Sequence, residues 1–223
     1  MQFLIRSIPM ETSRNTITIN PESPGDAAID QGTDVLEKGG LLVAPTETSY
    51  GLLGRADNQQ VLERLYALKR RPVSRATALL VGTLGEIEQL AHIDPLASIL
   101  IDRFLPGPLT LVLKARHNWP PPRVVDGKIG IRWSSAKIIG ALLSRIDFPV
   151  TATSANISGH PEPRSVESIK EALGDAVSLY MECGELSGPV STVVDCTGAT
   201  AKLLREGAIA RSDLLNCVGD KLD

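Results

Sequence analysis

The sequence predicts one α/β domain in which helices are layered on a β-sheet. Segments with apolar residues at helical spacing alternate along the chain with short apolar runs that are typical of buried strands. The 223 residues can bury one substantial core, and 43% hydrophobic with 22% charged residues is a globular composition. We therefore predict a flexible N-terminal segment at 1–15, a catalytic domain at 16–212 and a short C-terminal tail at 213–223.

The first half of the domain carries clear start and stop signals for its elements. Ser23, Pro24 and Asp26 predict the N-cap and first turn of a helix that Gly39 ends. Thr83 and Glu86 predict a capping box. The expected strands are 16–20, 41–44 and 78–81, and the expected helices are 24–38, 58–69 and 94–104, with further helical turns after Thr83.

The second half continues the alternation. The expected strands are 109–113, 128–132, 148–152, 177–181, 192–194 and 202–204, and the expected helices are 136–143 and 165–173. The prolines at 120–122 predict a surface loop, since they cannot lie inside a sheet. Ligands of open α/β sheets collect in loops beyond strand ends, so we expect a site near the loops after Ala44, Val81, Arg132 and Ala152.

Charge and cysteine usage narrow the class of protein. The net charge of −3 gives no global attraction to phosphate backbones, so nucleic-acid contact would need a local basic patch. The three cysteines never form a C-x-x-C pair, which suggests neither a disulfide framework nor a zinc site. We find no secretion signal and no apolar run of the roughly 20 residues that cross a bilayer, so we expect a cytoplasmic protein.

The segment 45–51 follows a predicted strand and is rich in hydroxyl groups. Its sequence, P-T-E-T-S-Y-G, places Thr46, Thr48, Ser49 and the carboxylate of Glu47 before Gly51. Such a loop can hold a small polar ligand. An ordinary polar connection explains the same residues.

Four cations gather at the end of the helix predicted over 58–69. They are Lys69, Arg70, Arg71 and Arg75. One or two would be explained by the negative end of the helix dipole, at about 0.3–1 kcal/mol each. Four exceed that need, and a lysine beside an arginine fork suits the oxygens of a polyphosphate.

Ser154 and Asn156 leave the strand predicted at 148–152. In an extended chain they project from the same side and could bind one ligand, although a polar turn is an equal alternative. Arg132 could pair with a carboxylate or be a surface arginine. The usual phosphate-loop, dinucleotide and nucleophile-elbow motifs are absent, and the three histidines are isolated, so we expect no protein metal ligands.

Taken together, these motifs resemble the YrdC-like family of threonylcarbamoyl-AMP synthases. They are P-T-E-T-S-Y-G at 45–51, L-K-R-R-P at 68–72, L-P-G-P-L-T at 105–110, G-I-R at 130–132, T-S-A-N-I-S-G at 153–159, S-T-V-V-D at 191–195 and L-L-R-E-G at 203–207. The resemblance implies a twisted mixed sheet flanked by helices, with a concave basic site. It also implies that threonine, bicarbonate and ATP with Mg²⁺ give threonylcarbamoyl-AMP and pyrophosphate.

The resemblance also assigns roles to residues. ATP would contact Lys69, Arg71, Ser154, Asn156 and Arg205, while the threonine or its carbamate would contact Thr46, Arg132 and Ser191. No protein nucleophile is needed, because the carbamate oxygen can attack the α-phosphorus itself. Partner proteins would pass the threonylcarbamoyl group to an adenosine in tRNA, with weak direct tRNA contact possible and no membrane involved.

Two positions depart from the long form of the family. Leu80 stands near the place of a histidine, and Ser134 stands where a proline often follows the arginine strand. We therefore expect the short form, without the extra C-terminal domain. Two alternatives remain, namely an RNA-binding module of the same fold and a related family member that does not use threonine.

Overall fold

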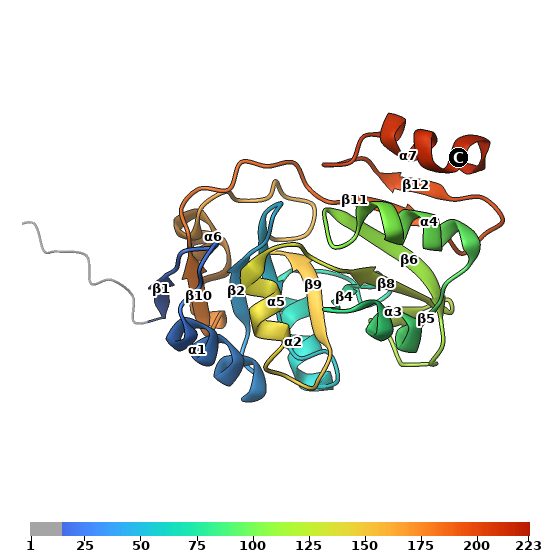
Figure 1. Cartoon of the computed structure of the whole chain (residues 1–223). Helices are drawn as coiled ribbons and strands as arrows, with labels where there is room; N and C mark the ends of the chain where they lie inside the picture. The colour runs from blue at the N-terminus through green and yellow to red at the C-terminus, as the bar shows by residue number, and fades with distance from the viewer. Residues whose placement is uncertain (1–14) are drawn as a thin grey trace, which may run out of the picture.

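The structure is a computed structural model that describes residues 15–223 (Figure 1). Its centre is one twelve-stranded mixed sheet. The strands are β1 Thr16–Thr18, β2 Leu42–Pro45, β3 Tyr50–Leu53, β4 Ala78–Leu80, β5 Ala91–His92, β6 Leu109–Ala115, β7 Val124–Val125, β8 Lys128–Arg132, β9 Val150–Ser154, β10 Leu179–Glu182, β11 Thr192–Asp195 and β12 Lys202–Arg205. The predicted α/β class with a mixed sheet is confirmed.

Helices connect and cover these strands. They are α1 Asp26–Glu37, α2 Gln59–Leu68, α3 Leu84–Leu90, α4 Pro95–Phe104, α5 Lys137–Leu143, α6 Val166–Leu173 and α7 Arg211–Val218, with short 3-10 turns at Gly174–Ala176 and Gly219–Lys221. Side-chain caps formed by Asn58, Thr83, Asp94 and Ser165 begin α2, α3, α4 and α6, and the cap predicted at Thr83 is among them. None of the helices in the part described is long and apolar enough to cross a bilayer.

The strand order is β1, β10, β2, β3, β9, β4, β8, β6, β11 and β12, with β5 beside β6 and β7 beside β8. Strand β9 lies near the middle and pairs with β3 at one end and with β4 at the other. The loop between β10 and β11 runs from one half of the sheet to the other (Figure 1). Elements far apart in the sequence therefore meet around β9.

The two halves of the sheet are covered differently. Around β2 and β3, helices α1 and α5 pack on one face, and α2 and α6 pack on the other. In the half that contains β6, β8 and β11, helices α4 and α7 pack on one face through alternate residues such as Leu111, Ile131 and Val194. The intervening residues of these strands belong to the opposite face, which is where the cavity described below lies.

Three local predictions need correction. Helix α1 has Gly25 at its N-cap, without a side-chain cap, so Ser23 does not cap it. Residues Tyr50 and Gly51 are not part of a loop but begin β3, which forms a hairpin with β2. The boundary predicted at residue 212 falls inside α7, whose Leu214 and Val218 are buried in the core, so the 213–223 segment is packed rather than a free tail.

Candidate functional site

A cavity of about 340 Å³ lies on the open face of the sheet. Its floor consists of alternate residues from adjacent strands, because side chains two apart in a strand share a face. The floor residues are Gly51 and Leu53 of β3, Ala152 and Ser154 of β9, Ala78 and Leu80 of β4, Gly130 and Arg132 of β8, Thr110 and Val112 of β6, and Val193 of β11. The site therefore lies on the sheet surface as well as beside the loops at strand ends.

Strand register places Ser154 and Lys128 on the same side of this floor. Ala78 of β4 pairs with Ala152 of β9 on one side and with Gly130 of β8 on the other. Continuing each pairing by two residues places Ala76 beside Ser154 and Lys128. The guanidinium of Arg71 donates from Nη2 to the Ala76 oxygen at 2.6 Å. We call Arg71, Ser154 and Lys128 the Arg71 side of the cavity.

Lys69 joins the end of α2 to the segment after β9 without lining the cavity. Its Nζ donates to the main-chain oxygens of Ser154 and Asn156, the latter at 2.8 Å, and to Asn156 Oδ1 at 3.1 Å. Ser154 Oγ also donates to Asn156 Oδ1, at 2.7 Å. Lys69 and Asn156 thus hold in place the segment that presents Ser154.

The environment of Lys69 disfavours its charge. The residue is 1% exposed. Burial first, and then the positive charge of Arg71, lower the pKa of Lys69 to about 8, although the negative charge of Glu162 raises it. The three oxygen acceptors favour the ammonium form, which is how a buried cation can be retained here.

The turn between β2 and β3 is held by Thr46. Its Oγ1 donates to the Ser49 oxygen at 2.6 Å and accepts from the main-chain nitrogens of Thr48 and Ser49 at 3.2 Å each. Thr46, Thr48 and Ser49 all line the cavity. The hydroxyl-rich segment is therefore a self-bonded turn that also faces the candidate site.

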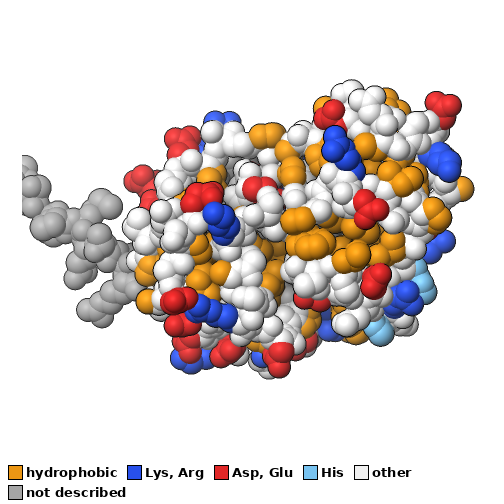
Figure 2. All heavy atoms as spheres, in the orientation of Figure 1, with side chains coloured by type: hydrophobic (Ala, Val, Ile, Leu, Met, Phe, Trp, Pro, Cys, Tyr) orange, Lys and Arg blue, Asp and Glu red, His pale blue; other side chains and the backbone are white. Residues whose placement is uncertain are grey.

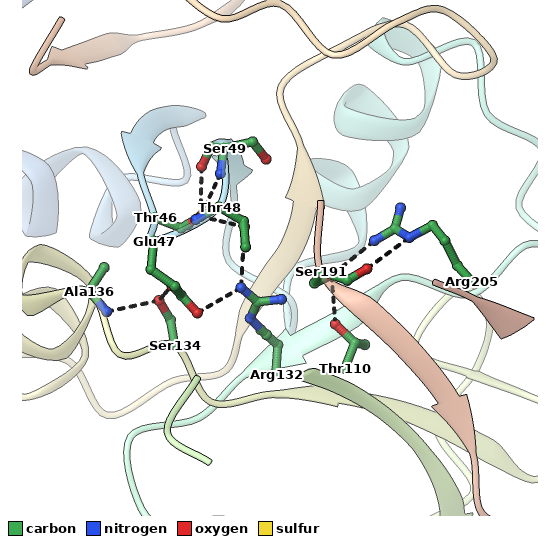
Figure 3. Close-up of polar contacts among 10 residues, drawn as sticks. All are labelled: Thr46, Glu47, Thr48, Ser49, Thr110, Arg132, Ser134, Ala136, Ser191 and Arg205. Carbon is green, nitrogen blue, oxygen red and sulfur yellow. Dashed lines mark hydrogen bonds and ion pairs between the residues drawn. The ribbon is translucent and has the colours of Figure 1, made fainter. Parts of the chain in front are cut away.

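Arg132 reaches this turn from β8, as Figure 3 shows. Its Nη2 donates to Glu47 Oε1 at 2.8 Å and to Thr48 Oγ1 at 3.3 Å. Ser134 Oγ donates to the other oxygen of Glu47 and accepts from the Ala136 nitrogen at 3.2 Å. Burial lowers the pKa of Arg132, whereas the charge and hydrogen bond of Glu47 raise it. Glu47 and Ser134 thus fix a buried guanidinium whose Nε has no hydrogen-bond partner.

A second polar group lies on the other side of Arg132 (Figure 3). Arg205 of β12 donates from Nε to the Ser191 oxygen at 3.0 Å and from Nη2 to Ser191 Oγ at 2.9 Å. Ser191 Oγ lies 3.2 Å from Thr110 Oγ1, and Thr110 pairs with Arg132 across β6 and β8. We call Thr46, Thr48, Arg132, Thr110, Ser191 and Arg205 the Arg132 side of the cavity.

Six of the eight predicted site residues line this one cavity. They are Thr46, Arg71, Arg132, Ser154, Ser191 and Arg205, while Lys69 and Asn156 lie behind the floor. The pairing of Glu47 with Arg132 was not predicted from the sequence, and neither were Lys128 and Glu162 as lining residues. Lys128 is ion-paired with Asp195 at 2.7 Å. Glu47 could have been suspected from the sequence, because it is the one carboxylate in the hydroxyl-rich 45–51 segment.

Metal-binding side chains do not gather at this site. Among residues 15–223, no group of three or more His, Cys, Asp and Glu side chains could hold a metal ion. His117 stacks on Trp119 with ring centroids 5.5 Å apart, and it does not line the cavity.

The segments that line this cavity lie within a part of the sequence that matches a known protein family. A sequence model of the Sua5/YciO/YrdC family, described as telomere recombination, matches residues 34–207. The chain belongs to this family. The match includes every residue of the Arg71 side and the Arg132 side.

Relatives within the family carry different names. The chain is 31% identical over 215 residues to a threonylcarbamoyl-AMP synthase of Bacillus subtilis, covering 94% of this chain and 62% of the relative. It therefore spans less than two thirds of that relative's length. It is also 31% identical over 193 residues to an uncharacterized Escherichia coli protein, YciO, covering 85% of this chain and 93% of the relative.

Solved structures of the family share the fold. Pyrococcus abyssi Sua5 complexed with L-threonine matches with a TM-score of 0.85 at 30% identity, covering 93% of this chain and 62% of that one. The E. coli YciO structure matches with a TM-score of 0.81 at 28% identity, covering 90% and 98% of the two chains. The expected YrdC-like fold is confirmed.

Proposed function

We propose that this chain is an L-threonylcarbamoyladenylate synthase. The observation that carries the proposal is one cavity lined by two guanidinium groups, that of Arg132, which Glu47 holds in place, and that of Arg71. One ligand with two separate anionic groups would satisfy both cations. A threonine-derived carbamate and the phosphates of ATP meet that requirement, and relatives named threonylcarbamoyl-AMP synthase support it.

The Arg132 side would hold the amino acid. An arginine fork matches a carboxylate in plane, and Arg132 is kept in one orientation by Glu47. The hydroxyls of Thr46, Thr48 and Ser191 surround it and could accept or donate to a threonine hydroxyl or its carbamate. In this proposal Thr46, Arg132 and Ser191 form the threonine and carbamate subsite.

The Arg71 side would hold the nucleotide. Arg71 and Ser154 line the cavity and would contact ATP directly, while Lys69 and Asn156 act from behind by fixing the segment that carries Ser154. Arg205 lies across the cavity and would reach the phosphates. Mg²⁺ would enter with ATP as part of the substrate.

The reaction requires positioning and charge stabilisation more than a protein nucleophile. Threonine and bicarbonate condense to a carbamate with loss of water. A carbamate oxygen then attacks the α-phosphorus, a new P–O bond forms, and the bond to pyrophosphate breaks. Arg71 and Arg205 would stabilise the negative charge that develops on the phosphates. The product would pass to transfer proteins that modify an adenosine in tRNA.

The test is threonine-dependent release of pyrophosphate from ATP with bicarbonate and Mg²⁺. We expect release with L-threonine and none when threonine or bicarbonate is omitted. Folded protein that releases no pyrophosphate under these conditions would rule the proposal out. Serine and valine, tested beside threonine, measure selectivity, because they lack the methyl group and the hydroxyl respectively.

A second candidate is a family member that does not use threonine. The similarity to YciO, which covers 93% of that protein, favours it. Pyrophosphate release with another amino acid and not with threonine would support this candidate. An RNA-binding module is a further candidate, and on the face drawn in Figure 2 the basic side chains are scattered and form no continuous patch. Binding of tRNA that weakens steeply with added salt would support the RNA-binding module.

A further inference from the structure

Strand β8 presents two cations to the cavity, one at each end of the same face. Lys128, Gly130 and Arg132 are alternate residues of this strand, and all three line the cavity. The four-residue step from Lys128 to Arg132 corresponds to about 13 Å between their Cα atoms, and Gly130 between them carries no side chain. The two cations can therefore contact different parts of one extended ligand.

The ammonium of Lys128 is held by a carboxylate of β11, across the intervening strand β6. Lys128 Nζ donates to Asp195 Oδ2 at 2.7 Å. Asp195 Oδ1 accepts from the Thr197 nitrogen at 2.8 Å and from Thr197 Oγ1 at 2.6 Å. Burial raises the pKa of Asp195, but the hydrogen bonds from Lys128 and Thr197 lower it overall. Asp195 thus stays charged and fixes where the ammonium of Lys128 lies.

Lys128 keeps donors that a ligand can use. An ammonium group has three N–H bonds, and within residues 15–223 the structure gives the Lys128 ammonium one hydrogen-bond partner, Asp195. The Lys128 side chain is 43% exposed, so the ion pair itself adds little to stability. Lys114 lies directly opposite Lys128 on β6, and like charges in that arrangement repel. An anion bound to Lys128 would reduce this repulsion.

The direction of the proposed reaction indicates which part of ATP would meet Lys128. The attacking and leaving oxygens lie roughly in line on opposite sides of the reacting phosphorus. With the carbamate on the Arg132 side, the pyrophosphate leaves in the direction away from Arg132. Along the face of β8 that direction leads to Lys128, which register places beside Ala76, the residue whose oxygen binds Arg71.

We propose that Lys128 binds the β- and γ-phosphates of ATP, which leave together as pyrophosphate. The ligand class is a polyphosphate, whose oxygens accept hydrogen bonds from the compact charge of a lysine ammonium. Lys128 would stabilise negative charge on the departing oxygens at the end of the cavity opposite Arg132. This inference rests on the proposed function, because the direction of departure assumes a carbamate held at Arg132.

The experiment is isothermal titration calorimetry on the full chain with ATP, inorganic pyrophosphate and AMP, each with Mg²⁺. We compare wild type, Lys128→Met, Lys128→Arg and the control Lys202→Met. Lys202 pairs with Asp195 from β12, is exposed and does not line the cavity. Lys128→Met should bind ATP and pyrophosphate about tenfold more weakly, as expected for the loss of one hydrogen bond between charged groups, and AMP as wild type does. Lys128→Arg should keep most of the affinity, and Lys202→Met should keep all of it.

The outcomes separate the inference from the proposed function. Wild type that binds neither ATP nor pyrophosphate overturns both. A Lys128→Met variant that binds both ligands as tightly as Lys202→Met does overturns the role of Lys128 alone. An equal loss of affinity for AMP and pyrophosphate, or a Lys128→Arg variant as weak as Lys128→Met, also overturns that role. The expected binding pattern in a chain that releases no pyrophosphate with threonine would reject the synthase and retain Lys128 as a polyphosphate ligand.

Discussion

Lys69 at the end of α2 donates two hydrogen bonds to Asn156, one to the main-chain oxygen at 2.8 Å and one to Oδ1 at 3.1 Å. The residues are 87 positions apart in the chain. Together they fix the 154–156 segment next to the Arg71 side of the cavity. The family resemblance predicts that Lys69 binds the nucleotide, and the structure shows it as a buried cation that holds this segment.

The first prediction concerns Lys69 and pH. Its pKa of about 8 in the folded chain lies below the ordinary 10.5, so the unfolded chain binds more protons between these values. Stability must therefore rise with pH across that window, by at most about 3 kcal/mol at 1.36 kcal/mol per pKa unit. Urea unfolding of wild type and Lys69→Met at pH 7.5 and pH 10 measures this.

The comparison isolates Lys69 because other groups titrate equally in both chains. The stability of wild type relative to Lys69→Met should increase from pH 7.5 to pH 10. Lys69→Met should also be the less stable chain at pH 10, since it leaves the acceptor oxygens of Ser154 and Asn156 unpaired. A difference that is the same at both pH values would show that the lysine pKa is not lowered.

The second prediction concerns the buried ion pair between Glu47 and Arg132. Their side chains are 17% and 7% exposed. Removing one partner of such a pair leaves an uncompensated buried charge, so Glu47→Gln should cost about 3 kcal/mol in the free energy of unfolding. The exposed pair of Arg55 with Asp57 provides the control, and Asp57→Asn should cost less than about 1 kcal/mol.

The KM for threonine should also change more in Glu47→Gln than in Asp57→Asn. Glu47→Gln frees the guanidinium of Arg132 from its fixed orientation, so the KM for threonine should rise while Asp57→Asn leaves it unchanged. Equal stability losses in the two variants would show that burial adds nothing to the pair. An unchanged KM in Glu47→Gln would remove Glu47 from the support of the site.

The sequence predicted most elements because their signals are local. Helix α4 begins at the Asp94–Pro95 signal and ends at Phe104 as expected, since capping acts within one turn. Strand β3 was missed because it is four residues long and Gly51 is a common turn residue. That glycine instead belongs to the cavity floor, where β3 pairs with β9.

The sequence predicted which residues belong to the site, but not which of them bond to one another. Arg132 and Glu47 are 85 positions apart, and no periodicity links them. The charge cluster at the end of α2 predicted contact with a polyphosphate, yet Lys69 lies at the C-cap of that helix, is buried, and donates to the segment that leaves β9. Such pairings depend on how the strands are ordered in the sheet, which a single sequence does not specify.

The third prediction concerns Arg205 on β12. Its side chain is exposed and donates hydrogen bonds only to Ser191 within the described chain, so Arg205→Ala should change the urea midpoint little. The kcat for pyrophosphate release should fall by about 100- to 1000-fold if the guanidinium stabilises charge on the phosphates. Lys202→Ala, an exposed position on the same strand, should leave kcat unchanged. Equal kcat values in both variants would take Arg205 out of the reaction.

The fourth prediction concerns Gly207, which lies directly behind the Arg132 side of the cavity. A Cβ at this position would lie 2.1 Å from the Val190 oxygen and 2.7 Å from the Ser191 carbon, and both are backbone atoms. Gly207→Ala must therefore displace Ser191, and with it the partner of Arg205. We expect destabilisation of about 1–3 kcal/mol and a higher KM for threonine.

Gly140 supplies the matched control for this change. It lies in α5, and a Cβ there meets no atom within 4 Å. Gly140→Ala should stabilise the chain by about 0.5–1 kcal/mol, because alanine loses less conformational entropy in a helix. Opposite shifts in the urea midpoint of the two glycine variants would show that steric contact at Ser191, and not the added methyl group itself, causes the loss. A Gly207→Ala variant as stable and active as wild type would mean that the backbone at 190–191 can move without disturbing the Arg132 side.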